Sequence, residues 1–89
     1  MHSNYEIIDT SPEYQNALQN LPNDVSEELQ IILKILEDDP FPSIAKQLRP
    51  PLQERYSIRI DGYRLIYRVN LNSHRIFLLS IEPRATVYI

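Results

Sequence analysis

The sequence predicts an α+β fold, in which an antiparallel sheet of about four strands packs against an N-terminal αα-hairpin in the order β-α-α-β-β-β. Two patterns indicate this class: a strictly alternating run over residues 55–69 that surrounds the only glycine, and apolar residues at helical spacing over residues 23–38. The 89 residues suffice for one small domain, which we expect to span residues 1–89.

The N-terminal part begins with a short apolar segment, residues 5–9, that is typical of a strand. We expect Thr10 to cap the first helix, because Pro12 then lies in the first turn and Glu13 takes the capping-box position. This helix is expected to end at Leu21, since the next residue is a proline.

A second helix is expected over residues 23–38. Its apolar residues recur at spacings of four and three, at Val25, Leu29, Ile32 and Leu36. After a proline-containing break, residues 44–48 are expected to form a single helical turn. A further strand is expected over residues 75–81, with Pro83 ending it.

Asp61-Gly62, between two alternating segments, indicates a β-hairpin with a type I′ turn. The register that follows pairs Ile60 with Tyr63, Arg59 with Arg64, Ile58 with Leu65, Tyr56 with Tyr67 and Arg55 with Arg68. One face of the hairpin is then apolar and faces the core, whereas the other carries four arginines with Ser57 and Ile66 between them. Like charges directly opposite each other destabilise a strand pair, so this arrangement favours an anionic partner.

The charge is distributed unevenly along the chain. The net charge is −3, but residues 1–45 carry −8 and residues 46–89 carry +5, and seven of the eight cations in the second half are arginines. Arginine has a planar fork that suits phosphate groups, so the second half predicts nucleic-acid binding. An alternative is that the two halves neutralise each other within the fold.

Several classes of site are excluded or disfavoured. The chain has no cysteine, and neither His2 nor His74 stands at a metal-ligand spacing, so we expect no metal site and no cofactor. One glycine cannot supply a phosphate-binding loop. The acidic run at residues 37–39 is interpreted as a solvated helix end. No signal peptide and no apolar run of membrane-spanning length is visible, so we expect a cytoplasmic protein without a membrane partner.

The remaining chemistry lies in the arginines and a C-terminal tyrosine. Guanidinium groups stabilise the charge that develops on a phosphodiester during cleavage, and Tyr88 could exchange a proton or stack on a base. Such a set suits metal-independent RNA cleavage, in which the 2′-hydroxyl of the substrate is the nucleophile. A non-catalytic basic groove would have the same composition.

The hairpin motif Tyr56-x-Ile58-Arg59-Ile60-x-Gly62-Tyr63-Arg64-Leu65-Ile66-Tyr67 and the closing Ile81-x-x-Arg84-x-x-Val87-Tyr88 resemble the RelE/ParE superfamily of bacterial toxins. The resemblance implies the toxin of a type II toxin–antitoxin pair. RelE-like members cleave mRNA in the ribosomal A site, ParE-like members inhibit DNA gyrase, and a degenerate toxin would act only with its antitoxin in operon repression. The RelE-like reading, a ribosome-dependent mRNA endonuclease, is our leading hypothesis.

By motif match, the resemblance implies catalytic roles for four residues. Arg59 and Arg64 would bind phosphate, Arg84 would stabilise the transition state and leaving group, and Tyr88 would orient the substrate or exchange a proton. We expect further RNA-binding residues at Lys46, Arg49, Arg55, Ser57 and Arg68. Ser57 stands where the RelE pattern has a lysine. The implied partners are a cognate antitoxin, the ribosome and mRNA, with operator DNA reached only through the antitoxin.

Overall fold

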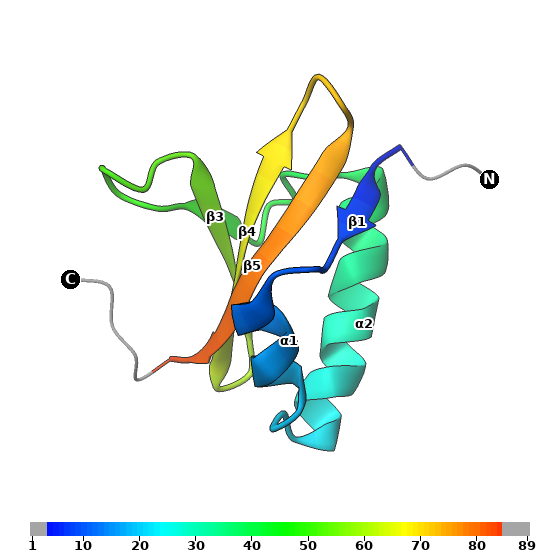
Figure 1. The fold of residues 1–89 in the computed structure, drawn as a ribbon, viewed down its shortest axis with the longest axis vertical. Coiled ribbons are helices and arrows are strands. Elements are labelled where there is room, and N and C mark those ends of the chain that lie inside the picture. Colours follow the sequence, from blue (N-terminus) through cyan, green and yellow to red (C-terminus); the bar gives the residue numbers. More distant parts are fainter. Residues whose placement is uncertain (1–3, 85–89) are drawn as a thin grey trace.

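In the computed structural model, which describes residues 4–84, two helices cover one face of a five-stranded sheet (Figure 1). The elements are β1 (Glu6–Ile8), α1 (Pro12–Leu18), α2 (Asn23–Asp38), β2 (Ala45–Gln47), β3 (Arg55–Ile60), β4 (Tyr63–Asn70) and β5 (Arg75–Pro83). The α+β class and the N-terminal helix pair are confirmed. The sheet has one strand more than expected.

The first helix begins one residue later than the sequence indicated. Its N-cap is Ser11 rather than Thr10, and the Ser11 hydroxyl accepts a hydrogen bond of 3.4 Å from the backbone N–H of Tyr14. The same hydroxyl donates to the carbonyl oxygen of Leu79 on β5 at 2.8 Å. Ser11 therefore caps the helix and fastens it to the sheet, a double role that depends on β5 being nearby.

Helix α1 also ends at Leu18 instead of Leu21. The backbone N–H groups of residues 19–21 bond to carbonyls three residues earlier, which is the 3₁₀ pattern and not the α-helical one. Helix α2 has the expected bounds. Its residues Val25, Leu29, Ile32 and Leu36 are buried, as their spacing predicted. Ile31 and Ile35 point away from this core and are exposed.

The sheet has the order β1-β5-β4-β3-β2, with β1 parallel to β5 and the other pairs antiparallel. Strand β2 replaces the helical turn expected over residues 44–48, so that prediction was wrong. The segment lies between Pro42 and Pro50 and is too short for a stable helix. The edge of β3 gives its backbone groups partners instead, with Lys46 opposite Ser57.

The hairpin register is confirmed for all five predicted pairs. The type I′ turn was wrong, because only Asp61 has a positive φ, of 52°, while the φ of Gly62 is not positive. A positive φ at the first central residue alone is the pattern of a type II′ turn.

Strand β5 runs to Pro83, two residues beyond the expected end. Strand β1 pairs only with the first three residues of β5. Among the described residues, the part of β5 that contains Pro83 therefore has a neighbouring strand on one side only, and an edge position of this kind tolerates proline. A bulge at Leu79 shifts the register between β4 and β5, which explains why buried Leu78 and Ile81 stand three residues apart.

The core lies between the helices and the inner face of the sheet. Ile58, Ile60, Leu65 and Tyr67 of the hairpin are fully buried there, as the alternation predicted. The Tyr67 hydroxyl donates a buried hydrogen bond of 2.9 Å to the carbonyl oxygen of Pro40, which anchors the chain after α2 to the sheet. No helix within residues 4–84 is long and apolar enough to cross a membrane.

Candidate nucleic-acid interface

The outer face of the sheet, opposite the helices, carries the arginines of the hairpin. At the end where the hairpin turns, three residues stand side by side on three neighbouring strands: Arg59 on β3, Arg64 on β4 and Glu82 on β5. We call this set the turn-end row. Directly opposite residues in an antiparallel pair have Cβ atoms about 4.5–5.5 Å apart, so the row concentrates two cations and one anion in a small area.

Arg84 lies at the same end of the sheet. Its backbone N–H donates a hydrogen bond of 2.8 Å to the carbonyl oxygen of Gly62 in the hairpin turn. This bond ties the chain beyond β5 to the turn between β3 and β4. The three arginines to which the resemblance gave catalytic roles are therefore brought to one end of the sheet. The fourth such residue, Tyr88, lies outside the described residues.

The next row of the outer face is electrically neutral at its centre. Its members are Lys46, Ser57, Ile66 and Ser80, from four neighbouring strands. Ser57 is only 9% exposed and Ile66 only 2% exposed. Ser57 therefore has little surface to offer to RNA, whereas Lys46 at the sheet edge is exposed.

Two arginines form the row beyond it. Arg55 stands opposite Arg68, and Arg68 stands opposite Phe77. The guanidinium of Arg68 lies over the Phe77 ring, 5.2 Å from its centroid, which is a cation–π contact. Arg55 has its Nε atom 3.7 Å from a carboxylate oxygen of Glu54. Arg49, the last of the expected RNA-binding residues, is exposed in the connection between β2 and β3 rather than on a strand.

The two like-charge pairs are therefore compensated in part within the protein. Glu82 stands beside Arg64, Phe77 lies under Arg68, and Glu54 lies near Arg55. The anionic partner expected for the arginine pairs stays a prediction.

Glu82 is the residue that sequence reasoning missed. It is half-buried, and one of its carboxylate oxygens accepts a hydrogen bond of 2.7 Å from the hydroxyl of Ser80. The alternation of Ser80 and Glu82 along one strand could have placed them on the same face. Their position opposite β4 could not be read from the sequence, because it depends on the bulge at Leu79.

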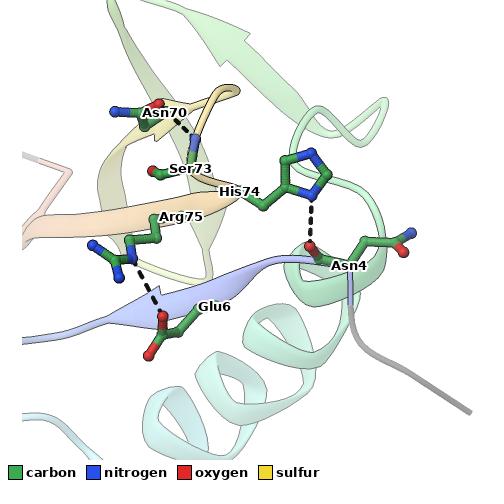
Figure 2. A network of polar contacts seen from close by, with 6 residues as sticks. All are labelled: Asn4, Glu6, Asn70, Ser73, His74 and Arg75. Atoms are coloured by element: carbon green, nitrogen blue, oxygen red, sulfur yellow. Dashed lines mark hydrogen bonds and ion pairs between the residues drawn. The ribbon is translucent and has the colours of Figure 1, made fainter.

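A second polar area lies at the opposite end of the sheet, where residues 4–7, Glu37 and residues 73–75 line an open depression of about 520 Å³. Figure 2 shows its contacts: the Nε of Arg75 lies 3.3 Å from a carboxylate oxygen of Glu6, and Nδ1 of His74 lies 3.2 Å from the carbonyl oxygen of Asn4. Arg75 and Glu6 are paired with each other there, and these contacts fasten the short strand β1. We interpret the area as structural and place the candidate site on the arginine face.

Within residues 4–84 no cluster of three or more histidine, aspartate or glutamate side chains could hold a metal ion. The groups available at the turn-end row are therefore guanidinium ions, which bind and stabilise anionic oxygens, and one carboxylate, which accepts hydrogen bonds or a proton.

Comparison with protein-family models and with curated proteins gives no match to this sequence. Solved structures do match it. The toxin–antitoxin complex RelBE2 from Mycobacterium tuberculosis aligns with a TM-score of 0.75 and 25% identity, covering 90% of this chain and 98% of that one. The archaeal RelE–RelB complex from Pyrococcus horikoshii aligns with a TM-score of 0.75 and 28% identity, covering 94% and 99%.

A YoeB/ParE toxin from Agrobacterium tumefaciens has the same fold, with a TM-score of 0.76 at 16% identity, over 89% of this chain and 98% of that one. The helix pair and the five-stranded sheet thus have the RelE-like fold. The chain is similar to toxins of the RelE/ParE superfamily.

Proposed function

We propose that this chain is the toxin of a type II toxin–antitoxin pair and acts as a ribosome-dependent, metal-independent endoribonuclease on mRNA. The observation that carries the proposal is the gathering of Arg59, Arg64 and Arg84 at one end of the outer face. The fold shared with RelE toxins supports the same activity.

The proposed reaction uses the RNA itself as the source of the nucleophile. The 2′-oxygen attacks the neighbouring phosphorus, the bond to the 5′-oxygen breaks, and the products are a 2′,3′-cyclic phosphate and a 5′-hydroxyl. Arg59 and Arg64 bind the phosphate oxygens in this scheme. Arg84 stabilises the charge on the phosphorane and on the leaving oxygen, and Tyr88 orients the substrate or exchanges a proton.

The rest of the outer face would hold the RNA on either side of the cleaved bond. Lys46 is exposed at the sheet edge, and Arg55 and Arg68 lie one row beyond the buried Ser57 and Ile66. Cations along such a surface bind successive phosphates without reading bases. Arg49 would add a positive charge from the connection between β2 and β3.

Mapping of mRNA ends by primer extension on translating ribosomes tests the proposal. We expect cuts in phase with codons for the wild-type protein and none for Arg84→Ala. Arg75→Ala is the matched control, because Arg75 is paired with Glu6 at the opposite end of the sheet; it should cut as the wild type does. Uncut mRNA with the wild-type protein would overturn the proposal.

A second candidate is a ParE-like inhibitor of DNA gyrase that has no catalytic activity. One observation favours it: Ser57 supplies no titratable amine at the position where the RelE pattern has a lysine, and its side chain is buried. Inhibited supercoiling by purified gyrase, together with uncut mRNA, would establish this candidate. If neither target is affected, the degenerate toxin that acts only in operon repression remains.

We also propose that a cognate antitoxin binds this chain, as RelB binds RelE in the complex from Pyrococcus horikoshii. An acidic or apolar segment of the antitoxin would cover the arginine face, since that face is cationic and exposed at Arg59 and Arg68. Co-expression of the neighbouring gene should relieve growth inhibition by this protein. Unrelieved inhibition would contradict the proposed partner.

A further inference from the structure

We propose that Glu82 is the catalytic base of the site and takes the proton from the 2′-hydroxyl of the RNA. This inference rests on the proposed endoribonuclease function and deepens it, since it supplies the proton acceptor that Ser57 cannot provide.

The position of Glu82 is the first argument. Glu82 stands directly opposite Arg64, the residue proposed to bind the phosphate that is cleaved. In RNA, the attacking 2′-oxygen and that phosphate belong to adjacent positions of the same nucleotide. A phosphate bound by Arg64 would keep the 2′-hydroxyl of the same nucleotide close to the residues beside Arg64, and Glu82 is the carboxylate among them.

The support of the carboxylate is the second argument. The Ser80 hydroxyl donates to Oε2 of Glu82 at 2.7 Å, from the same face of the same strand. This bond limits the orientations of the side chain. Because Glu82 is half-buried on a face that no helix covers, its carboxylate is held in place but not removed from solvent.

The other acceptors are less well placed. Within the described strands β3, β4 and β5, Glu82 is the one carboxylate. Glu54 precedes β3 at the far end of the hairpin, and His74 lies in the depression at the opposite end of the sheet. Asp61 is near the turn-end row but belongs to the turn itself, where its backbone has a positive φ.

The carboxylate takes the proton of the 2′-hydroxyl while the 2′-oxygen forms its bond to phosphorus. The bond from phosphorus to the 5′-oxygen breaks, the departing 5′-oxygen takes a proton from water, and the hydroxide that remains removes the proton from Glu82. Arg64 and Arg59 neutralise the phosphate oxygens, so that an anionic base and an anionic substrate can approach each other.

The test is single-turnover cleavage of mRNA in ribosome complexes with the wild type, Glu82→Gln and Asp61→Asn. Glutamine keeps an oxygen for the Ser80 hydroxyl and removes only the basic oxygen. We expect Glu82→Gln to lower the cleavage rate by about 10²–10⁴-fold, with binding to the ribosome complex equal or tighter. Asp61→Asn, the matched change at the same end of the sheet, should cleave at the wild-type rate.

The pH profile separates a base from a residue that only supports the fold. The cleavage rate of the wild type should depend on pH in a way that the rate of Glu82→Gln does not. If Glu82→Gln does not fold, as judged by urea unfolding, Ser80→Ala is used instead; it should keep the pH dependence of the wild type and cleave more slowly.

The outcomes distinguish the two proposals. A wild-type protein that does not cleave overturns the endoribonuclease and the base together. A wild type that cleaves, beside a folded Glu82→Gln variant with an equal rate or an unchanged pH profile, overturns the role of Glu82 and leaves the endoribonuclease standing.

Discussion

The backbone N–H of Arg84 donates a hydrogen bond to the carbonyl oxygen of Gly62, which joins the chain after β5 to the turn between β3 and β4. A residue 22 positions away in the sequence is thereby placed beside the hairpin arginines. Since a backbone bond does not depend on the arginine side chain, replacing that side chain should leave the placement intact. A substitution of the Arg84 side chain can therefore report on chemistry rather than on folding.

Arg64→Ala should lower the rate of mRNA cleavage by about 10²–10³-fold, the usual effect of removing one group that stabilises developing charge. Arg64 is central to the turn-end row, with Arg59 on one side and Glu82 on the other. Arg64→Lys keeps the charge but loses the planar fork, so it should recover only part of the rate. Single-turnover cleavage measures both variants. A wild-type rate in Arg64→Ala would show that phosphate binding does not involve this position.

Ser57→Lys should destabilise the protein, by about 1–3 kcal/mol, as is usual when a larger side chain enters a packed position. Ser57 is almost fully buried between Lys46 on β2 and Ile66 on β4. A lysine there would also stand opposite another lysine. Urea unfolding measures the change, with Lys46→Ser/Ser57→Lys as a control that removes the facing charge. If Ser57→Lys were as stable as the wild type, the packing around position 57 would have to accommodate a lysine without cost.

Gly62→Ala should raise the free energy of unfolding by about 0.4–1 kcal/mol, although glycine-containing turns usually resist this change. The φ of Gly62 is not positive, and a Cβ atom built there has no atom within 4 Å. Asp61→Ala should have the opposite sign, because alanine tolerates the φ of 52° at position 61 less well than aspartate. Urea unfolding of the two variants checks the assignment, and reversed signs would point to a type I′ turn.

The free energy of unfolding should fall as the pH rises from about 10 to about 12. Burial, and secondly the charge of Asp9, raises the pKa of Tyr14 to about 12 in the folded chain. In the unfolded chain the phenol has its ordinary pKa of about 10 and loses its proton first. Deprotonation then favours unfolding, whereas below about pH 10 Tyr14 has no effect on the pH dependence.

Tyr14→Phe should reduce this fall, although it should not abolish it. Burial also raises the pKa of Tyr67, so that a second tyrosine acts in the same direction. Urea unfolding at about pH 8 and about pH 11 measures the difference for the wild type and the variant. An equal fall in both proteins would contradict the contribution of Tyr14.

The parts of the fold that the sequence predicted well depend on neighbours along the chain. Helix α2 has the expected bounds because its apolar spacing and the prolines around it act within a few residues. The hairpin register is also local, since Asp61 and Gly62 bring adjacent strands together. The error at the start of α1 concerns Ser11, whose hydroxyl has a partner on β5, far away in the sequence.

The sequence predicted how two of the candidate site residues pair, but it did not predict one of their neighbours. Arg59 and Arg64 face each other as expected, since both belong to the hairpin. Glu82 was overlooked because only the pairing of β4 with β5 places it beside Arg64. The bulge at Leu79 shifts that pairing by one residue, and alternation along the chain does not reveal it.

The sequence by itself determined the α+β class, the bounds of α2 and the arginine face of the hairpin, because periodicity and turn residues act over short distances. Only the tertiary structure decided that Glu82 stands beside Arg64, that Ser57 is buried, and that Arg84 reaches the turn at Gly62. These relationships join strands that are distant along the chain. Their register follows from packing of the whole sheet, and no local pattern encodes it.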